Sequence, residues 1–275
     1  MRFSLARVLL VLASLSSLAA EAQAVAPAPE APAAPVAPAE KPRKVLLLGD
    51  SLIVTSFGES LEERLNAQPG VHAVRRAKSS TGLARPDFFD WMAVGREEVE
   101  RNQPDVVVVI MGGNDGQGLT DGHGKAQAQW GAAHWEATYR QRTVDFLRTL
   151  EAPGRRLLWV ELPVTGLPRF ERKLSLIRRV LREAVTGHAS ATHLDTRPFF
   201  TDAKGHLLKE APVEGFRKPM RLRMEDGVHF TLAGGRYFAG KVHPEVVRLL
   251  TPPEPTAQRA PEPEPWLVPL VFITP

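Results

Sequence analysis

Short runs of strand-forming residues alternate with helical patterns along most of this 275-residue sequence, and no other feature limits the possible folds so strongly. The run Val106 to Ile110 is apolar at every position, which is typical of a parallel strand covered on both faces of its sheet. Strands that alternate with helices over about 200 residues predict one doubly wound α/β domain around a parallel sheet. The expected strands cover residues 44–49, 71–77, 105–112, 156–162 and 192–196, and the expected helices cover 57–67, 90–101, 134–150, 170–186 and 232–250.

The N-terminus has the pattern of an export signal. Arg2 and Arg7 precede an apolar run over residues 8–20, and the Ala-Gln-Ala sequence at 22–24 supplies a small-x-small cleavage site. Residues 1–24 are therefore predicted to be a secretory signal peptide, so we expect the protein to be exported to the periplasm or secreted. The apolar run is shorter than the roughly 20 residues that a membrane-spanning helix needs, and no stable membrane span is expected.

Proline-rich segments flank the central part of the sequence. Residues 25–42 are rich in Pro and Ala and are predicted to be an extended linker, and residues 252–275 form a Pro-rich C-terminal tail. A single folded domain is therefore expected over residues 43–251.

Composition excludes several kinds of chemistry. The sequence contains no cysteine, so disulfides, thiolate metal sites and cysteine nucleophiles are excluded. The formal net charge is +4, and basic and acidic residues alternate without a long block of one sign. Nucleic acid is therefore not expected as a partner.

Three of the predicted turns carry polar residues that suit catalysis. Ser51 follows the first strand, Asn114 follows the third strand, and Asp226 and His229 precede the last helix. In a doubly wound sheet, ligands bind outside the carboxyl ends of the strands, so these turns are expected to meet at one edge. Each residue alone has a common structural use, as a helix cap or in a turn. Together they supply what a serine nucleophile needs, which is a base, an acid that orients the base, and a donor for the oxyanion.

The sequences of these turns resemble those of a known family. Gly49-Asp50-Ser51-Leu52, Gly112-Gly113-Asn114-Asp115 and Asp226-Gly227-Val228-His229 match, in order, three sequence blocks of the SGNH hydrolases, which are also called GDSL-type esterases and lipases. The resemblance covers about residues 43–250 and implies a flavodoxin-like three-layer α/β/α sandwich. The general α/β-hydrolase pattern is a poorer match, because no Gly-x-Ser-x-Gly elbow surrounds Ser51.

The resemblance also implies a role for each residue. Ser51 would be the nucleophile and, through its backbone N–H, an oxyanion donor, while His229 would be the base and Asp226 the acid that orients it. The side-chain amide of Asn114 would be another oxyanion donor. The family's remaining block is a lone glycine whose N–H completes the oxyanion hole, and the best match for it is Gly82.

The surroundings of these turns bear on the substrate. Asp50, beside the nucleophile, and Gln117, in the long loop 115–133, are candidate substrate-binding residues, and the loop is expected to form one wall of the site. Segment 199–225 either holds an anionic polymer through a basic stretch or is a solvated surface hairpin around Lys204-Gly205. The basic stretch contains Arg217, Lys218, Arg221 and Arg223. The sequence shows no long apolar lid, which favours a carbohydrate ester over a long-chain lipid.

The expected activity is hydrolysis of acyl esters, above all acetyl esters, of cell-envelope or other carbohydrate, without a cofactor and without a metal. The same site would serve a polysaccharide or peptidoglycan O-acetyltransferase working beside a membrane-bound O-acyltransferase. A catalytically silent cell-wall binding module is a third possibility, and the complete catalytic set argues against it. A Mg²⁺ site would leave His229 and Asn114 without a role, and its candidate ligands are Asp50, Asp115, Asp195 and Asp226.

Overall fold

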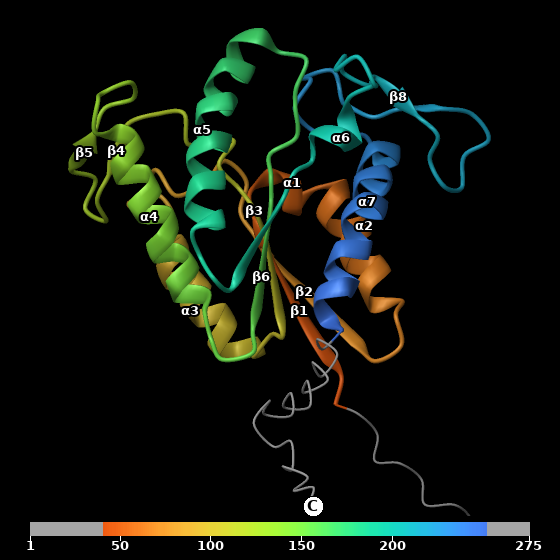
Figure 1. Ribbon diagram of the computed structural model, residues 1–275, viewed down its shortest axis with the longest axis horizontal. Coiled ribbons are helices and arrows are strands. Elements are labelled where there is room, and N and C mark those ends of the chain that lie inside the picture. Colours follow the sequence, from red (N-terminus) through yellow and green to blue (C-terminus); the bar gives the residue numbers. More distant parts are fainter. Residues whose placement is uncertain (1–40, 252–275) are drawn as a thin grey trace, which may run out of the picture. The chain divides into compact units, whose positions relative to one another are not determined.

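The computed structural model describes residues 41–251, and a five-stranded, all-parallel sheet lies at their centre (Figure 1). The strand order is β2-β1-β3-β6-β7. Every residue of β3 is buried, as its continuous apolar sequence predicts for a strand covered on both faces. The five strands are β1 (Arg43–Gly49), β2 (Val71–Ala77), β3 (Val106–Ile110), β6 (Arg156–Val160) and β7 (Ala191–Leu194).

Helices cover both faces of this sheet (Figure 1). On one face, α2 (Ser56–Asn66) and α7 (Leu232–Leu250) pack against each other, and on the other face lie α3 (Trp91–Asn102), α4 (Trp135–Leu150) and α5 (Pro168–Thr186). The predicted doubly wound, single-domain α/β/α sandwich is therefore confirmed. The strands and helices expected from the sequence are all present, within a few residues of their expected bounds.

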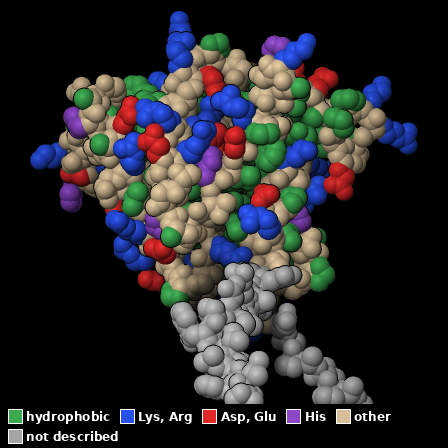
Figure 2. All heavy atoms as spheres, in the orientation of Figure 1, with side chains coloured by type: hydrophobic (Ala, Val, Ile, Leu, Met, Phe, Trp, Pro, Cys, Tyr) green, Lys and Arg blue, Asp and Glu red, His purple; other side chains and the backbone are tan. Residues whose placement is uncertain are grey.

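Shorter elements occupy the connections between these strands and helices, and the sequence patterns did not predict them. They are α1 (Ser51–Val54), α6 (Arg197–Phe200), the hairpin of β4 (Leu119–Thr120) with β5 (Ala126–Ala128), and the pair of β8 (Glu210–Ala211) with β9 (Met220–Arg221). On the face drawn in Figure 2, acidic and basic side chains are interspersed, in keeping with the mixed charge of the sequence.

The predicted signal peptide, most of the predicted linker and the C-terminal tail lie outside residues 41–251. Within residues 41–251, no helix is long and apolar enough to cross a membrane.

The start of α7 packs very closely against its neighbours. A Cβ added to Gly234 would lie 1.9 Å from the backbone oxygen of Leu222, so no larger residue fits there without a shift of the backbone. In the same region, the Ser56 hydroxyl of α2 donates to the backbone oxygen of Thr231 at 3.0 Å. This contact joins the segment that leaves β1 to the segment that enters α7.

We expect Gly234→Ala and Gly240→Ala, in the same helix, to change stability in opposite directions. Gly234→Ala should lower the free energy of unfolding by about 1–3 kcal/mol, because its methyl group overlaps backbone. Gly240→Ala should raise it by up to about 1 kcal/mol, since the nearest atom to an added Cβ there lies 3.9 Å away and alanine is the better helix former. Urea unfolding followed by circular dichroism measures both. An unchanged free energy of unfolding in Gly234→Ala would contradict the close packing of α7 at this position.

Candidate active site

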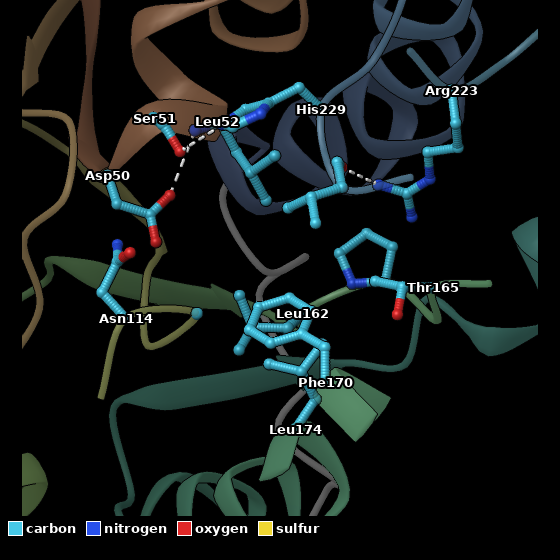
Figure 3. Close-up of a pocket in the computed structure, with 13 residues that line it drawn as sticks. Asp50, Ser51, Leu52, Asn114, Leu162, Thr165, Phe170, Leu174, Arg223 and His229 are labelled. Carbon is cyan, nitrogen blue, oxygen red and sulfur yellow. Dashed lines mark hydrogen bonds between the residues drawn. The ribbon is translucent and has the colours of Figure 1, made fainter. Parts of the chain in front are cut away.

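The side chains of Ser51, His229 and Asp226 form a continuous hydrogen-bonded row. His229 Nε2 lies 2.9 Å from Ser51 Oγ (Figure 3), and His229 Nδ1 lies 2.7 Å from Asp226 Oδ2. The serine and the histidine are 178 positions apart in the sequence, so the fold itself brings them together. This geometry lets the imidazole take the serine proton while the carboxylate orients the ring.

Ser51 stands in a tight turn between β1 and α1. The turn is fixed by Asp50, whose Oδ1 accepts a hydrogen bond from the Leu52 N–H at 3.1 Å and so caps α1. Burial of Asp50 raises the pKa of its carboxyl to about 7, against the lowering effect of the Leu52 hydrogen bond and together with the nearby charge of Asp115. Asp50 also lines the cleft beside Ser51, as expected of a substrate-binding candidate, although its carboxyl already serves the helix cap.

His229 is carried by a turn that Asp226 organises. Asp226 Oδ1 accepts hydrogen bonds from the backbone N–H groups of Val228 and His229, each at 2.9 Å, and Gly227 adopts a φ of +69° that suits glycine. Burial works to raise the pKa of Asp226, but the hydrogen bonds from the His229 ring and from these two N–H groups outweigh it and hold the pKa at about 2. Asp226 is therefore a carboxylate throughout the neutral range.

Asn114 lies beside Ser51 in the same cleft (Figure 3). Its side-chain amide donates to the backbone oxygen of Thr81 at 2.9 Å, which leaves its second N–H free of that bond. Its own backbone oxygen accepts from the Gln117 side chain at 2.7 Å, so Gln117 supports the turn that carries Asn114. Gln117 lines a neighbouring hollow rather than the cleft itself.

Gly82 packs against the buried carboxylate of Asp115. A Cβ added to Gly82 would lie 2.2 Å from Asp115 Oδ1, so glycine is required for this approach. The Asp115 carboxylate accepts from the N–H groups of Leu83 and Ala84, each at 2.9 Å, and from the Tyr139 hydroxyl at 2.6 Å. Gly82 lines the hollow that also contains Gln117, and its part in the oxyanion hole stays a prediction.

The acidic residues considered for a Mg²⁺ site are engaged otherwise. Asp115 accepts three hydrogen bonds from protein donors, and Asp195 Oδ1 accepts from the Arg197 N–H at 2.8 Å, which orders the turn before α6. Among residues 41–251, no group of three or more His, Asp or Glu side chains is arranged to hold a metal ion. We therefore build no step of the chemistry on a metal.

An apolar cleft, which the sequence did not reveal, opens beside Ser51 (Figure 3). Its cavity volume is about 70 Å³. Much of its wall comes from the segment after β6 and from the first turns of α5, and its apolar side chains are Leu52, Leu162, Pro163, Phe170, Leu174 and Val228. The spacing of Phe170 and Leu174, four residues apart at the start of a helix, is the one sequence signal that could have indicated this wall.

Arg223 connects this wall to the histidine turn. It is 7% exposed, and its guanidinium donates to the backbone oxygen of Val164 at 2.8 Å and to that of Val228. The guanidinium carbon also lies 4.0 Å from the ring centroid of Phe230. Because Val228 and Phe230 flank His229, Arg223 helps to hold that histidine in place.

Arg223 differs from the other residues of the basic stretch, because it is buried and they are exposed. Burial lowers the pKa of Arg223 to about 10, which leaves it charged at neutral pH, but its charge faces backbone oxygens rather than solvent. Arg217, Lys218 and Arg221 are exposed. Arg223 is therefore not part of a surface for an anionic polymer.

Fold and site together define the class of this protein. A three-layer α/β/α sandwich with serine, histidine and aspartate in a row at the carboxyl edge of a parallel sheet has the architecture of the SGNH hydrolases, as the sequence blocks indicated. Within that class, the chain belongs to the family described as "Protein of unknown function (DUF459)", which matches residues 44–245.

Comparison with solved structures supports the same fold. TesA is 21% identical with a TM-score of 0.50, over 75% of this chain and 99% of that chain. The psychrotrophic esterase EstA from Pseudoalteromonas sp., in a structure inhibited by monoethylphosphonate, is 11% identical with a TM-score of 0.52, over 76% of this chain and 98% of that chain. A search of curated proteins found no match. At these identities the likeness is one of fold.

Arg223→Met should slow reaction at Ser51 and also lower stability. Methionine fills similar space but leaves buried carbonyl oxygens without a donor, which costs about 1–3 kcal/mol for each of them. We expect hydrolysis of a chromogenic acetyl ester to slow by about 10-fold or more, since small displacements of a catalytic group cost up to about 10²-fold. Arg221→Met is the matched control, because Arg221 is exposed two residues away, and it should behave as wild type. Equal rates for the two variants would contradict the inference that Arg223 holds His229 in place.

Proposed function

We propose that this protein is an exported, serine-dependent ester hydrolase that removes short acyl groups, acetyl above all, from carbohydrate. The observation that carries the proposal is the hydrogen-bonded row of Ser51, His229 and Asp226 beside a small apolar cleft and the amide of Asn114. The likeness of fold to the psychrotrophic esterase EstA supports ester chemistry.

The reaction follows from the geometry. Ser51 Oγ attacks the ester carbonyl carbon while His229 Nε2 takes the hydroxyl proton, and the carbonyl oxygen becomes an oxyanion. The backbone N–H of Ser51, the second amide N–H of Asn114 and the N–H of Gly82 are its donors in this proposal. His229 then gives the proton to the leaving alcohol oxygen as the C–O bond breaks, which leaves an acyl-Ser51 ester. Water attacks that ester with His229 again as base, and His229 then returns the proton to Ser51 Oγ as the acyl C–Oγ bond breaks and the carboxylic acid departs.

Asp226 keeps its charge during both steps. Its pKa of about 2 lies far below neutral pH, so it accepts the His229 Nδ1–H as a carboxylate and stabilises the imidazolium that forms. The neighbouring Asp50 does not have this role, because His229 Nδ1 is bound to Asp226 Oδ2, while Asp50 Oδ1 accepts from the Leu52 N–H and caps α1.

The cleft supports a short acyl group. A cavity of about 70 Å³ is small beside the roughly 300–1,000 Å³ of a typical pocket for a drug-sized ligand, and its lining is mainly apolar. A methyl or other short alkyl group would be removed from water there, with its carbonyl carbon near Ser51. The export signal predicted for residues 1–24 supports a substrate outside the cytoplasm, such as a cell-envelope polysaccharide.

The direct test of this function is covalent labelling of the nucleophile. After exposure of the purified protein to a serine-directed phosphonate, mass spectrometry should show one adduct, located on the peptide that contains Ser51. Ser51→Ala is the control and should remain unlabelled. A folded wild-type protein that is labelled elsewhere or not at all would exclude the serine mechanism.

Asn114→Ala and His229→Ala should separate the oxyanion donor from the base. Asn114→Ala should still form the acyl-enzyme but about 10²- to 10³-fold more slowly, the usual cost of one lost oxyanion donor. His229→Ala should fall further, towards the background rate, because Ser51 loses its base. Single-turnover acylation by a chromogenic acetyl ester measures both rates, with circular dichroism as the check on folding. Wild-type rates in both variants would show that the site is wrong.

The fate of the acyl group distinguishes the hydrolase from the O-acetyltransferase alternative. The proposed hydrolase releases acetate at a rate that added sugar does not change. Acyl-enzyme that forms fast but turns over only when a sugar acceptor is added would identify a transferase, with a membrane-bound O-acyltransferase as its expected donor partner.

A further inference from the structure

A second hollow adjoins the catalytic cleft on the far side of Asn114. It has a cavity volume of about 250 Å³, and its lining residues include Ser80, Arg85, Phe88 and Gln117. Asn114 joins the two spaces: it lines the cleft, its amide donates to the Thr81 oxygen in the hollow, and its backbone oxygen accepts from Gln117. The part of a bound ester that extends from Ser51 away from the apolar cleft would therefore enter this hollow.

The loop that carries Phe88 is built to keep the ring exposed. The N–H groups of Phe88 and Phe89 both donate to the Arg85 oxygen, at 3.1 and 3.0 Å, which forms a tight turn. Phe89 turns inward and packs edge-on against Trp91, with ring centroids 5.0 Å apart, while Phe88 remains 60% exposed. One face of an aromatic ring is thus offered to solvent at the rim of the hollow.

Ion pairs and hydrogen bonds hold this turn in one conformation. Arg85 donates twice to Asp87, at 2.9 and 2.7 Å, and Asp87 also accepts the Thr120 hydroxyl. Arg142 of α4 donates to the backbone oxygen of Thr120 at 2.8 Å. It also donates to the backbone oxygens of the two residues directly before Arg85. Single exposed apolar residues are common on protein surfaces. A rigid turn that presents an aromatic face beside a catalytic cleft, with polar groups around it, fits a binding site better than chance exposure.

We propose that this hollow is the subsite for the sugar ring of the ester, with Phe88 as its stacking platform. The inference rests on the proposed ester hydrolysis, and it adds where the alcohol part of the substrate binds. A pyranose ring has an apolar face of C–H groups and a rim of hydroxyls. The Phe88 ring would stack on the C–H face. The hydroxyl of Ser80, the amide of Gln117 and the guanidinium of Arg85 would form hydrogen bonds with the sugar hydroxyls.

The experiment compares two acetyl esters that differ in the alcohol, 6-O-acetylglucose and ethyl acetate. The measured quantity is the ratio of their kcat/KM values in wild type and in Phe88→Ala, Phe88→Leu and Phe88→Trp. We expect the ratio to fall about 3- to 10-fold in the alanine and leucine variants, and to be retained in the tryptophan variant, because the contact depends on an aromatic face. Leu232→Ala is the matched control, since Leu232 is 59% exposed but lines neither the cleft nor the hollow, and it should leave the ratio unchanged.

A binding measurement keeps this inference separate from the proposed function. Ser51→Ala, with and without Phe88→Ala, is titrated with 6-O-acetylglucose by calorimetry, and the affinity should fall about 3- to 10-fold when Phe88 is removed. An unchanged ratio together with an unchanged affinity would overturn the sugar subsite, even if ester hydrolysis stands. Phe88-dependent binding without hydrolysis by the wild-type protein would support the subsite and refute the proposed activity.

Discussion

The parallel pairing of β1 with β3 determines where the chemistry of this protein can lie. Gly49 and Ile110 are paired at the ends of these strands, so the turn that carries Ser51 and the turn that carries Asn114 leave the sheet side by side. The strands approach so closely there that a Cβ added to Gly49 would lie 2.2 Å from the Ile110 oxygen. The glycine before Asp-Ser is thus required by strand spacing, and the sheet places Ser51 and Asn114 side by side, as the proposed nucleophile and oxyanion donor require.

Three carboxyl groups near the carboxyl edge of the sheet differ in burial and in the groups that they bind. Asp50 and Asp115 are 2% and 1% exposed, and burial raises the pKa of each, although both accept hydrogen bonds that oppose this effect. Their oxygens bind backbone N–H groups and shape the turns. Asp226 is more exposed, and its hydrogen bonds hold its pKa at about 2, so it supplies a fixed negative charge to His229.

The sequence predicted most of what depends on local pattern and little of what depends on packing between distant segments. The apolar run of β3 and the helical periods were enough to predict the α/β sandwich. The resemblance of the Asp-x-x-His block placed Asp226 beside the His229 ring, but its hydrogen bonds to the backbone of the turn were not predicted. Arg223 could not be recognised, because three other cations near it in the sequence suggested a solvated surface. Its partner Val164 lies 59 positions away in the sequence and is brought to it by the fold.

Arginine side chains hold the irregular backbone on both sides of the site. On the side of the apolar cleft, Arg178 and Arg223 donate to three successive backbone oxygens at 2.6–2.9 Å, those of Leu162, Pro163 and Val164. On the side of the Phe88 hollow, Arg142 donates to three more at 2.8–2.9 Å, those of Leu83, Ala84 and Thr120. A buried carbonyl without a donor costs about 1–3 kcal/mol, and one guanidinium has five N–H groups with which to satisfy several of them. The chain has no cysteine, so disulfides cannot brace these loops, and the arginines are the cross-links that let the loops keep the shape of a binding site.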